Sequence, residues 1–303
     1  GWGPGDEVVV TRLDHDSNVR PWVQAAERTG ATVRWVDFDA ATGELSTDAI
    51  AAAVNGRTRV VAVTAASNLI GTMPDIPAIA AVAHAAGALL YVDAVHYAAH
   101  ELVDLPALGA DLLVCSPYKF LGPHCGVLAA APTLLESIVP DKLLPSTDAV
   151  PERFEFGTLP YEIMAGATEA VEVLAALDPE ATGSRRERLA ASFAALARHE
   201  SALLARLDAG LATLPVAVWS RAAHRTPTVL VTADDATGGR AASALYRALA
   251  ERDILAPASN FYAIEASRLL GLGDAGGLRV GLAPYTTPDE IDRLLAALTE
   301  LLA

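Results

Sequence analysis

The stretch that decides the fold is Ala88–Asp93 (ALLYVD), a short apolar run that ends on an acid; a similar run, Asp111–Ser116 (DLLVCS), follows it. Short apolar runs bounded by turn signals and rich in β-branched residues are typical of buried strands. Similar runs lie upstream at Glu7–Thr11, Val33–Phe38 and Arg59–Ala65. Because Ala-rich stretches separate them, the pattern predicts βα units and an α/β fold around a mostly parallel sheet.

Helical candidates fill the gaps between these runs: Asn18–Thr29, Ser46–Val54 with Ser46 as N-cap, and Pro74–Ala86 with prolines near its start. A last run, Gly126–Ala130, follows Asp111–Ser116 after a turn that contains Gly122-Pro123. The connection, of roughly ten residues, is too short for a helical crossover, so we expect this pair to be antiparallel. The prediction is a mixed sheet with helices on both faces.

The second half of the chain predicts a smaller α+β unit. One long amphipathic helix is expected over Arg185–Leu211. Beyond it we expect strands at Val216–Trp219, Thr228–Thr232 and Leu278–Leu282, a helix near Gly239–Glu251, and a final helix capped by Thr287 and opened by Pro288. With 303 residues, we predict a large domain over residues 1–175 and a small C-terminal domain over 176–303 that includes the long linking helix.

Composition excludes several classes of protein. The chain has 22 Lys plus Arg and 37 Asp plus Glu, a net charge of −15, which disfavours nucleic acid and anionic membrane surfaces as partners. The most apolar stretch, residues 79–99, is interrupted by His84, Asp93 and His96, so we expect no membrane span. Two cysteines, Cys115 and Cys125, make no disulfide framework and favour a reduced, cytoplasmic setting.

Polar side chains follow the predicted strands at the points where those strands end. In open α/β sheets, the carboxyl ends of parallel strands form the ligand crevice. We therefore expect one rim to gather the residues that follow the strands: His15, Ser67, Asn68, Asp93, His96, Ser116, Tyr118 and Lys119.

This set of side chains suits pyridoxal phosphate (PLP), which has a basic ring nitrogen, a phenolic oxygen, an aldehyde and a phosphate. A carboxylate keeps the ring nitrogen protonated, an amine forms the Schiff base, hydroxyls receive the phosphate and an aromatic ring stacks on the pyridine. Taken singly, Asp93 could be a helix N-cap or a surface carboxylate, Lys119 a surface lysine, and His15 and His96 ordinary loop residues. Their combination favours PLP. No glycine-rich nucleotide motif follows a strand, which disfavours a nucleotide-binding enzyme.

Ordered motifs along the whole chain carry a family resemblance. They are Leu13–Asn18 with Pro21-Trp22, Ser67–Thr72, Val92–His96, Ser116–Lys119, Glu155–Thr158 and Gly277–Gly281. Together they resemble the class V aminotransferase family of PLP-dependent enzymes with the type I PLP-dependent transferase fold and, within it, the cysteine desulfurase-like branch. The resemblance covers residues 1–303.

The resemblance implies a role for each motif. His15 would stack on the pyridine, Asp93 would pair with its nitrogen, and Lys119 would be the catalytic Schiff-base lysine. Asn68 would reach the cofactor oxygen or the substrate carboxylate, and Arg279 would hold that carboxylate.

Other implied contacts concern the phenolic oxygen, the phosphate and a second subunit. His96 stands where relatives commonly have glutamine, so we expect it to contact the phenolic oxygen. Ser116 belongs to the Schiff-base segment, and Tyr118 replaces a histidine that binds the phosphate. Thr158 belongs to a segment that reaches the phosphate of the partner subunit, which implies a homodimer with shared active sites. We expect no metal.

Two departures from the family pattern affect the expected function. Desulfurases place a nucleophilic cysteine shortly before the late arginine, whereas the interval Asn260–Gly277 contains none, and Cys115 and Cys125 do not match it. The chain also opens at Gly1 on a turn, without the family's upstream phosphate-binding loop, so we expect the large domain to be N-terminally incomplete. The expectation is a PLP-dependent enzyme acting on an amino acid. Transaminase, C–S lyase, epimerase and desulfurase chemistry stay open, as does a truncated non-catalytic relative.

Overall fold

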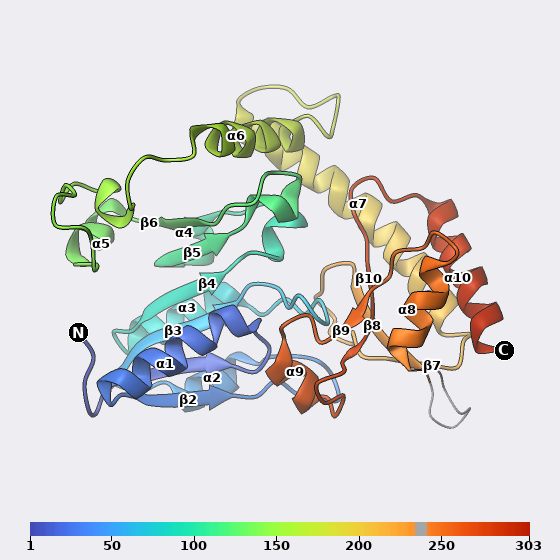
Figure 1. Ribbon diagram of the computed structural model, residues 1–303, viewed down its shortest axis with the longest axis horizontal. Coiled ribbons are helices and arrows are strands. Elements are labelled where there is room, and N and C mark those ends of the chain that lie inside the picture. Colours follow the sequence, from blue (N-terminus) through green and yellow to red (C-terminus); the bar gives the residue numbers. More distant parts are fainter. Residues whose placement is uncertain (234–240) are drawn as a thin grey trace.

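The computed structural model describes residues 1–233 and 241–303, and it contains two β-sheets joined by long helices (Figure 1). The first sheet consists of β1 (Glu7–Thr11), β2 (Thr32–Val36), β3 (Thr58–Thr64), β4 (Leu89–Asp93), β5 (Leu112–Cys115) and β6 (Val127–Ala130). Its order is β2-β1-β3-β4-β5-β6. All neighbours are parallel except β5 and β6, so the predicted mixed sheet with one antiparallel pair is confirmed.

Helices cover both faces of this sheet, because successive residues of a strand point to opposite sides. On one face, Val8 and Val10 of β1 belong to a buried cluster with residues of α1 (Arg20–Thr29). On the other face, Val9 belongs to the main core with residues of α2 (Thr47–Ala53), α3 (Ile76–Ala85) and α4 (Leu105–Leu108). Ser46 caps α2 as predicted, and Asp75 caps α3.

Two helices lead from the first sheet to the second. After the short α5 (Pro132–Ser137), α6 (Tyr161–Ala175) packs against α7 (Arg185–Leu211), the long helix that the sequence predicts with the same bounds. Ser184 and Glu187 form a capping box at the start of α7. Figure 1 shows α7 running from α6 to the C-terminal sheet. The sequence analysis did not foresee α6, whose first residue follows a proline.

The second sheet is antiparallel and has the order β7-β8-β10-β9. Its strands are β7 (Val216–Val218), β8 (Thr228–Ala233), β9 (Ala258–Ser259) and β10 (Gly277–Gly281). It packs with α8 (Ala242–Ala250) and α10 (Pro288–Leu302), where Thr287 caps α10 as expected. The predicted helix near Gly239–Glu251 corresponds to α8, although Gly239 and Arg240 lie outside the described residues.

One segment of the C-terminal part returns to the first core. Helix α9 (Ile264–Leu269) and its flanks place Ala263, Ala266 and Leu270 in the same buried cluster as β3 and β4. The predicted boundary at residues 175 and 176 falls at the end of α6. The residues around α9 thus bring the second sheet close to the carboxyl edge of the first sheet. Within the described parts of the chain, no helix is long and apolar enough to cross a membrane.

Candidate active site

All but one of the polar residues that the sequence places after the strands meet in one cavity of about 490 Å³. The exception is Ser67, which is buried outside this lining and accepts the backbone N–H groups of Leu69 and Ile70. The cavity is lined by the predicted residues His15, Asn68, Asp93, His96, Ser116, Tyr118, Lys119 and Arg279. Most of them stand at the carboxyl ends of β1, β3, β4 and β5, and Arg279 comes from β10 in the second sheet. The expected convergence on one rim is therefore present.

Lys119 lies in the short 3-10 helix η3 (Pro117–Phe120) at the reversal between β5 and β6. Leu121, directly after it, has φ of 70°, and a Cβ on Gly122 would come within 2.8 Å of the Pro117 side chain. This tight turn fixes the lysine backbone. No carboxylate of the described residues pairs with its amine. Partial burial lowers the pKa of Lys119, the Arg279 charge lowers it further and Asp93 opposes both, which favours the nucleophilic free amine.

Asp93 ends β4 and is buried. Its Oδ1 accepts the backbone N–H of Val95 at 2.8 Å, and no described residue donates to its Oδ2. Burial raises the pKa of Asp93, while the Val95 N–H and the Lys119 charge oppose that rise. A buried carboxyl with one free oxygen is suited to a cationic N–H partner.

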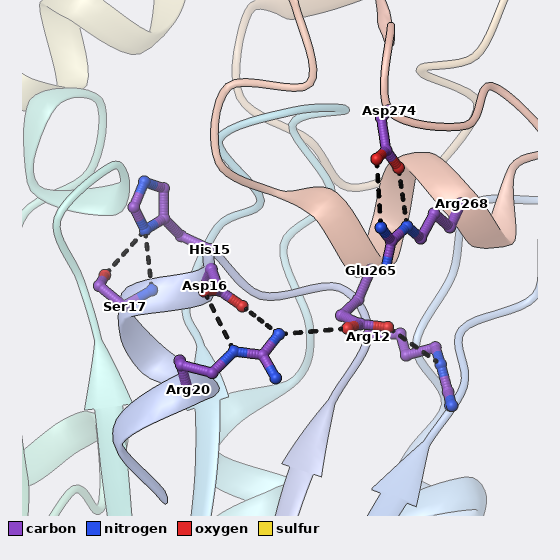
Figure 2. A network of polar contacts seen from close by, with 8 residues as sticks. All are labelled: Arg12, His15, Asp16, Ser17, Arg20, Glu265, Arg268 and Asp274. Atoms are coloured by element: carbon purple, nitrogen blue, oxygen red, sulfur yellow. Dashed lines mark hydrogen bonds and ion pairs between the residues drawn. The ribbon is translucent and has the colours of Figure 1, made fainter. Parts of the chain in front are cut away.

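His15 caps the 3-10 helix η1 (Asp16–Asn18), and this cap fixes its tautomer. Its Nδ1 accepts the backbone N–H of Ser17 at 3.1 Å and lies 2.8 Å from the Ser17 hydroxyl, so the neutral ring carries its proton on Nε2 (Figure 2). The ring stacks on Tyr262, with the ring centroids 5.6 Å apart and the planes at 30°. Burial first, and then the charge of Lys119, lower the pKa of His15, which favours the neutral form.

An ionic network ties α9 to the turn that carries His15 (Figure 2). Glu265 of α9 lies 3.5 Å from Arg20 and 3.7 Å from Arg12. Arg20 also pairs with Asp16 at 2.9 Å. In addition, the Asp16 N–H donates to the carbonyl of Tyr262 at 2.8 Å. These contacts hold the Tyr262 segment beside the rim of the first sheet.

Arg279 approaches the cavity from the second sheet. Its guanidinium carbon lies 3.7 Å from the ring centroid of Phe261, and one of its Nη atoms donates to the backbone carbonyl of Asn68 at 2.6 Å. Burial lowers the pKa of Arg279 to about 10, and no described carboxylate lies within ion-pair distance of it. The Asn68 Nδ2 donates to the Phe261 carbonyl at 2.9 Å, while its buried Oδ1 has no partner. Arg279 and Asn68, which both line the cavity, thus supply a cation without a described counterion and a buried acceptor without a partner.

Ser116 and Tyr118 flank the lysine. Ser116 precedes η3 and makes no side-chain capping bond, so its hydroxyl is available to a ligand. The Tyr118 ring stacks on His124 at a centroid distance of 5.0 Å, and the Lys119 amine lies 5.6 Å from the Tyr118 centroid. Both hydroxyl residues line the cavity, as the sequence predicts.

The sequence analysis missed the aromatic pair Phe261 and Tyr262, which also lines the cavity. Both residues have left-handed backbones, with φ of 52° and 60°. Such conformations cost side-chain-bearing residues free energy and cluster at functional sites. The available signal was two adjacent aromatic residues in the interval before Arg279.

The predicted site residue Thr158 and the two cysteines lie apart from the cavity. Thr158 is exposed between the 3-10 helix η4 (Glu152–Phe154) and α6, and it does not line the cavity of its own chain. Cys115 ends β5 and Cys125 lies in the turn before β6, and both thiols are free. Neither cysteine lines the cavity.

Comparison with known families gives a match over nearly the whole chain. The family model described as "Aminotransferase class-V" matches residues 1–294. Among curated relatives, the uncharacterized protein MT3887 of Mycobacterium tuberculosis (strain CDC 1551 / Oshkosh) is 35% identical over 99% of this chain and 74% of its own length. The aminotransferase-like protein FGM3 of Gibberella zeae is 33% identical over 99% of this chain and 73% of its own length.

Solved structures agree with this match. The cysteine desulfurase CsdA of Escherichia coli superposes with a TM-score of 0.85 at 27% identity and covers 100% of this chain and 74% of its own. A cysteine desulfurase of Thermococcus onnurineus superposes with a TM-score of 0.80 at 23% identity over 99% of this chain, which supports the fold alone. The described chain thus corresponds to about three quarters of these proteins.

Proposed function

Because the chain belongs to the class V aminotransferase family, whose members are PLP-dependent enzymes, we propose that it binds PLP through Lys119 and acts at the α-carbon of an amino acid. The observation that carries this proposal is the position of Arg279. Its guanidinium lies in the same cavity as Lys119 and Asp93 and has no described carboxylate partner. A cation can bind the carboxylate of an α-amino acid, while an amine and a buried acid can bind the aldehyde and the ring nitrogen of a pyridine cofactor.

The residues present fit PLP on several independent observations. The free Oδ2 of Asp93 would accept the pyridine N–H, and the imidazole of His15 would stack on the ring. The buried Asn68 Oδ1, which has no partner, would accept a hydrogen bond from the ligand. Ser116 and Tyr118 would supply hydroxyls to the phosphate. When bound, PLP supplies an electron sink for a bond at the substrate's α-carbon.

The protein's own groups then divide the work. Arg279 would bind the substrate carboxylate bidentately, with Phe261 holding the plane of the guanidinium. Lys119, whose pKa is lowered by burial, would remove a proton at the α-carbon and return one. Orientation of the substrate between these two residues would select among transamination, elimination and epimerisation.

We propose that the reaction does not pass sulfur to a cysteine of this chain. Support comes from Cys115 and Cys125, neither of which lines the cavity. The double variant Cys115→Ala, Cys125→Ala should keep its turnover of the amino acid that a substrate screen identifies. A desulfurase would be supported instead if the double variant lost that turnover and only the unmodified protein released alanine from cysteine.

The experiment that tests the proposal uses the fact that the sequence contains two lysines, Lys119 and Lys142. Lys142 lies 3.2 Å from Asp148 and does not line the cavity. The protein is incubated with PLP, reduced with borohydride and mapped by mass spectrometry. We expect the cofactor on Lys119, and we expect Lys119→Ala to abolish the visible absorbance of bound PLP while Lys142→Ala retains it. Cofactor on Lys142 alone, or no retained cofactor, would overturn the proposal.

We also propose a homodimer with shared active sites. Support comes from the exposed apolar side chains between β6 and α6, which include Val127, Leu128, Leu144, Phe156 and Tyr161. Mass measurement in solution gives the oligomeric state. Mixing Lys119→Ala protein with Thr158→Val protein should restore activity if Thr158 serves the partner's site, and two variants that stay inactive together would contradict sharing.

A reduced, cytoplasmic location is proposed on the two free thiols alone.

A further inference from the structure

A buried polar chain leads from the long helix α7 to the wall of the cavity. Glu200, in the middle of α7, is 4% exposed, and both its carboxylate oxygens lie near His100 Nδ1, at 3.0 and 3.1 Å. His100 follows the 3-10 helix η2 (Tyr97–Ala99) and is 7% exposed. Its ring packs edge-on against His96, with centroids 5.0 Å apart and planes at 67°. Three titratable side chains are therefore in series, and only the last, His96, lines the main cavity.

The carboxylate of Glu200 fixes one end of this chain. Because a carboxylate accepts hydrogen bonds, the proton of His100 stands on Nδ1, where both oxygens are in reach. A buried carboxylate needs such a partner. The contact also joins α7 to the segment that follows β4, so that the His100 ring is held against His96.

Hydroxyl groups fix the tautomer of His96 at the other end. Its Nε2 lies 3.0 Å from the hydroxyls of both Thr226 and Thr228. The Thr226 hydroxyl donates to the Gly71 carbonyl at 3.4 Å, whereas Thr228 has no other acceptor among the described residues. Both hydroxyls are satisfied when Nε2 accepts from Thr228, which places the proton of His96 on Nδ1.

Three groups on different segments oppose a positive charge on His96. His100 stands on its own segment, Lys119 on η3 and Arg279 on β10. Burial is the largest cause that lowers the pKa of His96, and these three groups lower it further. On the far side, Glu101 faces His100 and Glu200, and burial raises its pKa. The surroundings favour a neutral His96.

We propose that Glu200 and His100 are positioning residues that keep the His96 ring in place and neutral, while Thr228 fixes its Nδ1–H tautomer, so that the cavity wall presents a fixed hydrogen-bond donor to an oxyanion. His96 lines both the main cavity and a second cavity of about 240 Å³ that shares Lys119 and Arg279 with it. The identity of the oxyanion rests on the proposed function: if PLP binds here, the oxyanion is its phenolic oxygen. The tautomer of His96 and the positioning by Glu200 and His100 do not depend on the cofactor.

Nuclear magnetic resonance of the cofactor-free protein, labelled with ¹⁵N at histidine, tests the inference. The ring nitrogens of His96 are assigned with His96→Gln and followed from about pH 5 to about pH 8. We expect the Nδ1–H pattern throughout the neutral range. Thr228→Val, which keeps the shape of the side chain, should give a mixture of both tautomers. His100→Gln should move the protonation midpoint of His96 to higher pH, because His100 is one of the groups that lower the pKa of His96.

His84→Gln is the matched control, because His84 forms a histidine–carboxylate pair with Asp111 at 2.9 Å on the surface. It should leave the His96 signals unchanged. If His100→Gln does not fold, Glu200→Gln removes the carboxylate that orients His100 and should likewise move the His96 signals. An Nε2–H pattern, or His96 signals that neither Thr228→Val nor the pair variants move, would overturn the inference.

The same proteins separate the two proposals. If Lys119 captures PLP but the His96 signals do not change in the variants, the positioning role is wrong and the proposed function stands. Predicted His96 signals without capture of PLP would remove the proposed function and leave the tautomer assignment.

Discussion

The guanidinium of Arg279 lies over the ring of Phe261, with its carbon 3.7 Å from the ring centroid, and donates to the carbonyl of Asn68. This cation–π contact holds the guanidinium without neutralising its charge, since an aromatic ring offers only its quadrupole. The guanidinium therefore remains able to form an ion pair with the carboxylate of a ligand.

Replacing Arg279 by Gln should weaken binding of the amino acid by about 10- to 150-fold, because a charged hydrogen-bonded pair contributes about 1.5–3 kcal/mol. Capture of PLP by Lys119 should persist. The measurement is titration of the PLP absorbance with substrate. Arg206→Gln, which breaks an exposed pair with Asp292, should bind as the unmodified protein does. Equal weakening in both variants would show that the effect is not local.

The Lys119 amine should react as a base weaker than an ordinary lysine, because partial burial and Arg279 lower its pKa. Competitive acetylation of the cofactor-free protein, with Lys142 as internal reference, measures the midpoint. Arg279→Gln should move the Lys119 midpoint to higher pH, and Asp93→Asn should move it to lower pH, because Asp93 raises the pKa. Shifts in the same direction in both variants would contradict this account.

Asp14 lies under the His15 turn, fully buried, where it contacts the Thr11 hydroxyl and the Asn18 amide. Burial raises its pKa to about 8, so the folded protein keeps a proton that the unfolded chain loses near the ordinary value of 3.8. The contribution of Asp14 to the free energy of unfolding is therefore complete below pH 3.8. It falls as the pH rises to about 8, by up to about 1.4 kcal/mol per pH unit.

Asp14→Asn should therefore be more stable than the unmodified protein above pH 8 and should flatten the dependence below it. Urea unfolding at several pH values gives both curves. Parallel curves would mean that Asp14 titrates normally in the folded state.

Glu265 should contribute modestly to holding the Tyr262 segment, because partly exposed ion pairs contribute about 0.2–1 kcal/mol. Glu265→Gln should speed hydrogen exchange of the Asp16 amide, which donates to Tyr262, by about 1.5- to 5-fold. High salt should reduce the difference. Asp274→Asn, which breaks the exposed Arg268 pair on the same helix, should leave that amide unchanged.

Local sequence signals predicted the first sheet and its rim well. Strands such as Glu7–Thr11 and the long helix Arg185–Leu211 have the expected bounds, because burial and helical spacing leave clear patterns. Residues after strand ends met in one cavity because parallel strands share their carboxyl edge. The roles of these residues and the two-domain division remain predictions.

Contacts between distant segments could not be predicted in the same way. The pairing of His100 with Glu200 joins positions 100 residues apart, and neither position has a local signature. Phe261 and Tyr262 likewise contact Asn68, Arg279 and His15, which lie far away in sequence. Such features depend on tertiary packing, which overrides residue preference.

The cavity takes its side chains from two sheets, and this division has an evolutionary consequence. Lys119 and Asp93 belong to the first sheet, whereas Phe261 and Arg279 belong to the segment around the second. If the chain acts on an amino acid as proposed, mutations in residues 258–281 can therefore change its specificity while the groups proposed to hold the cofactor stay as they are. Substrate choice and cofactor chemistry can diverge separately among descendants of such a chain.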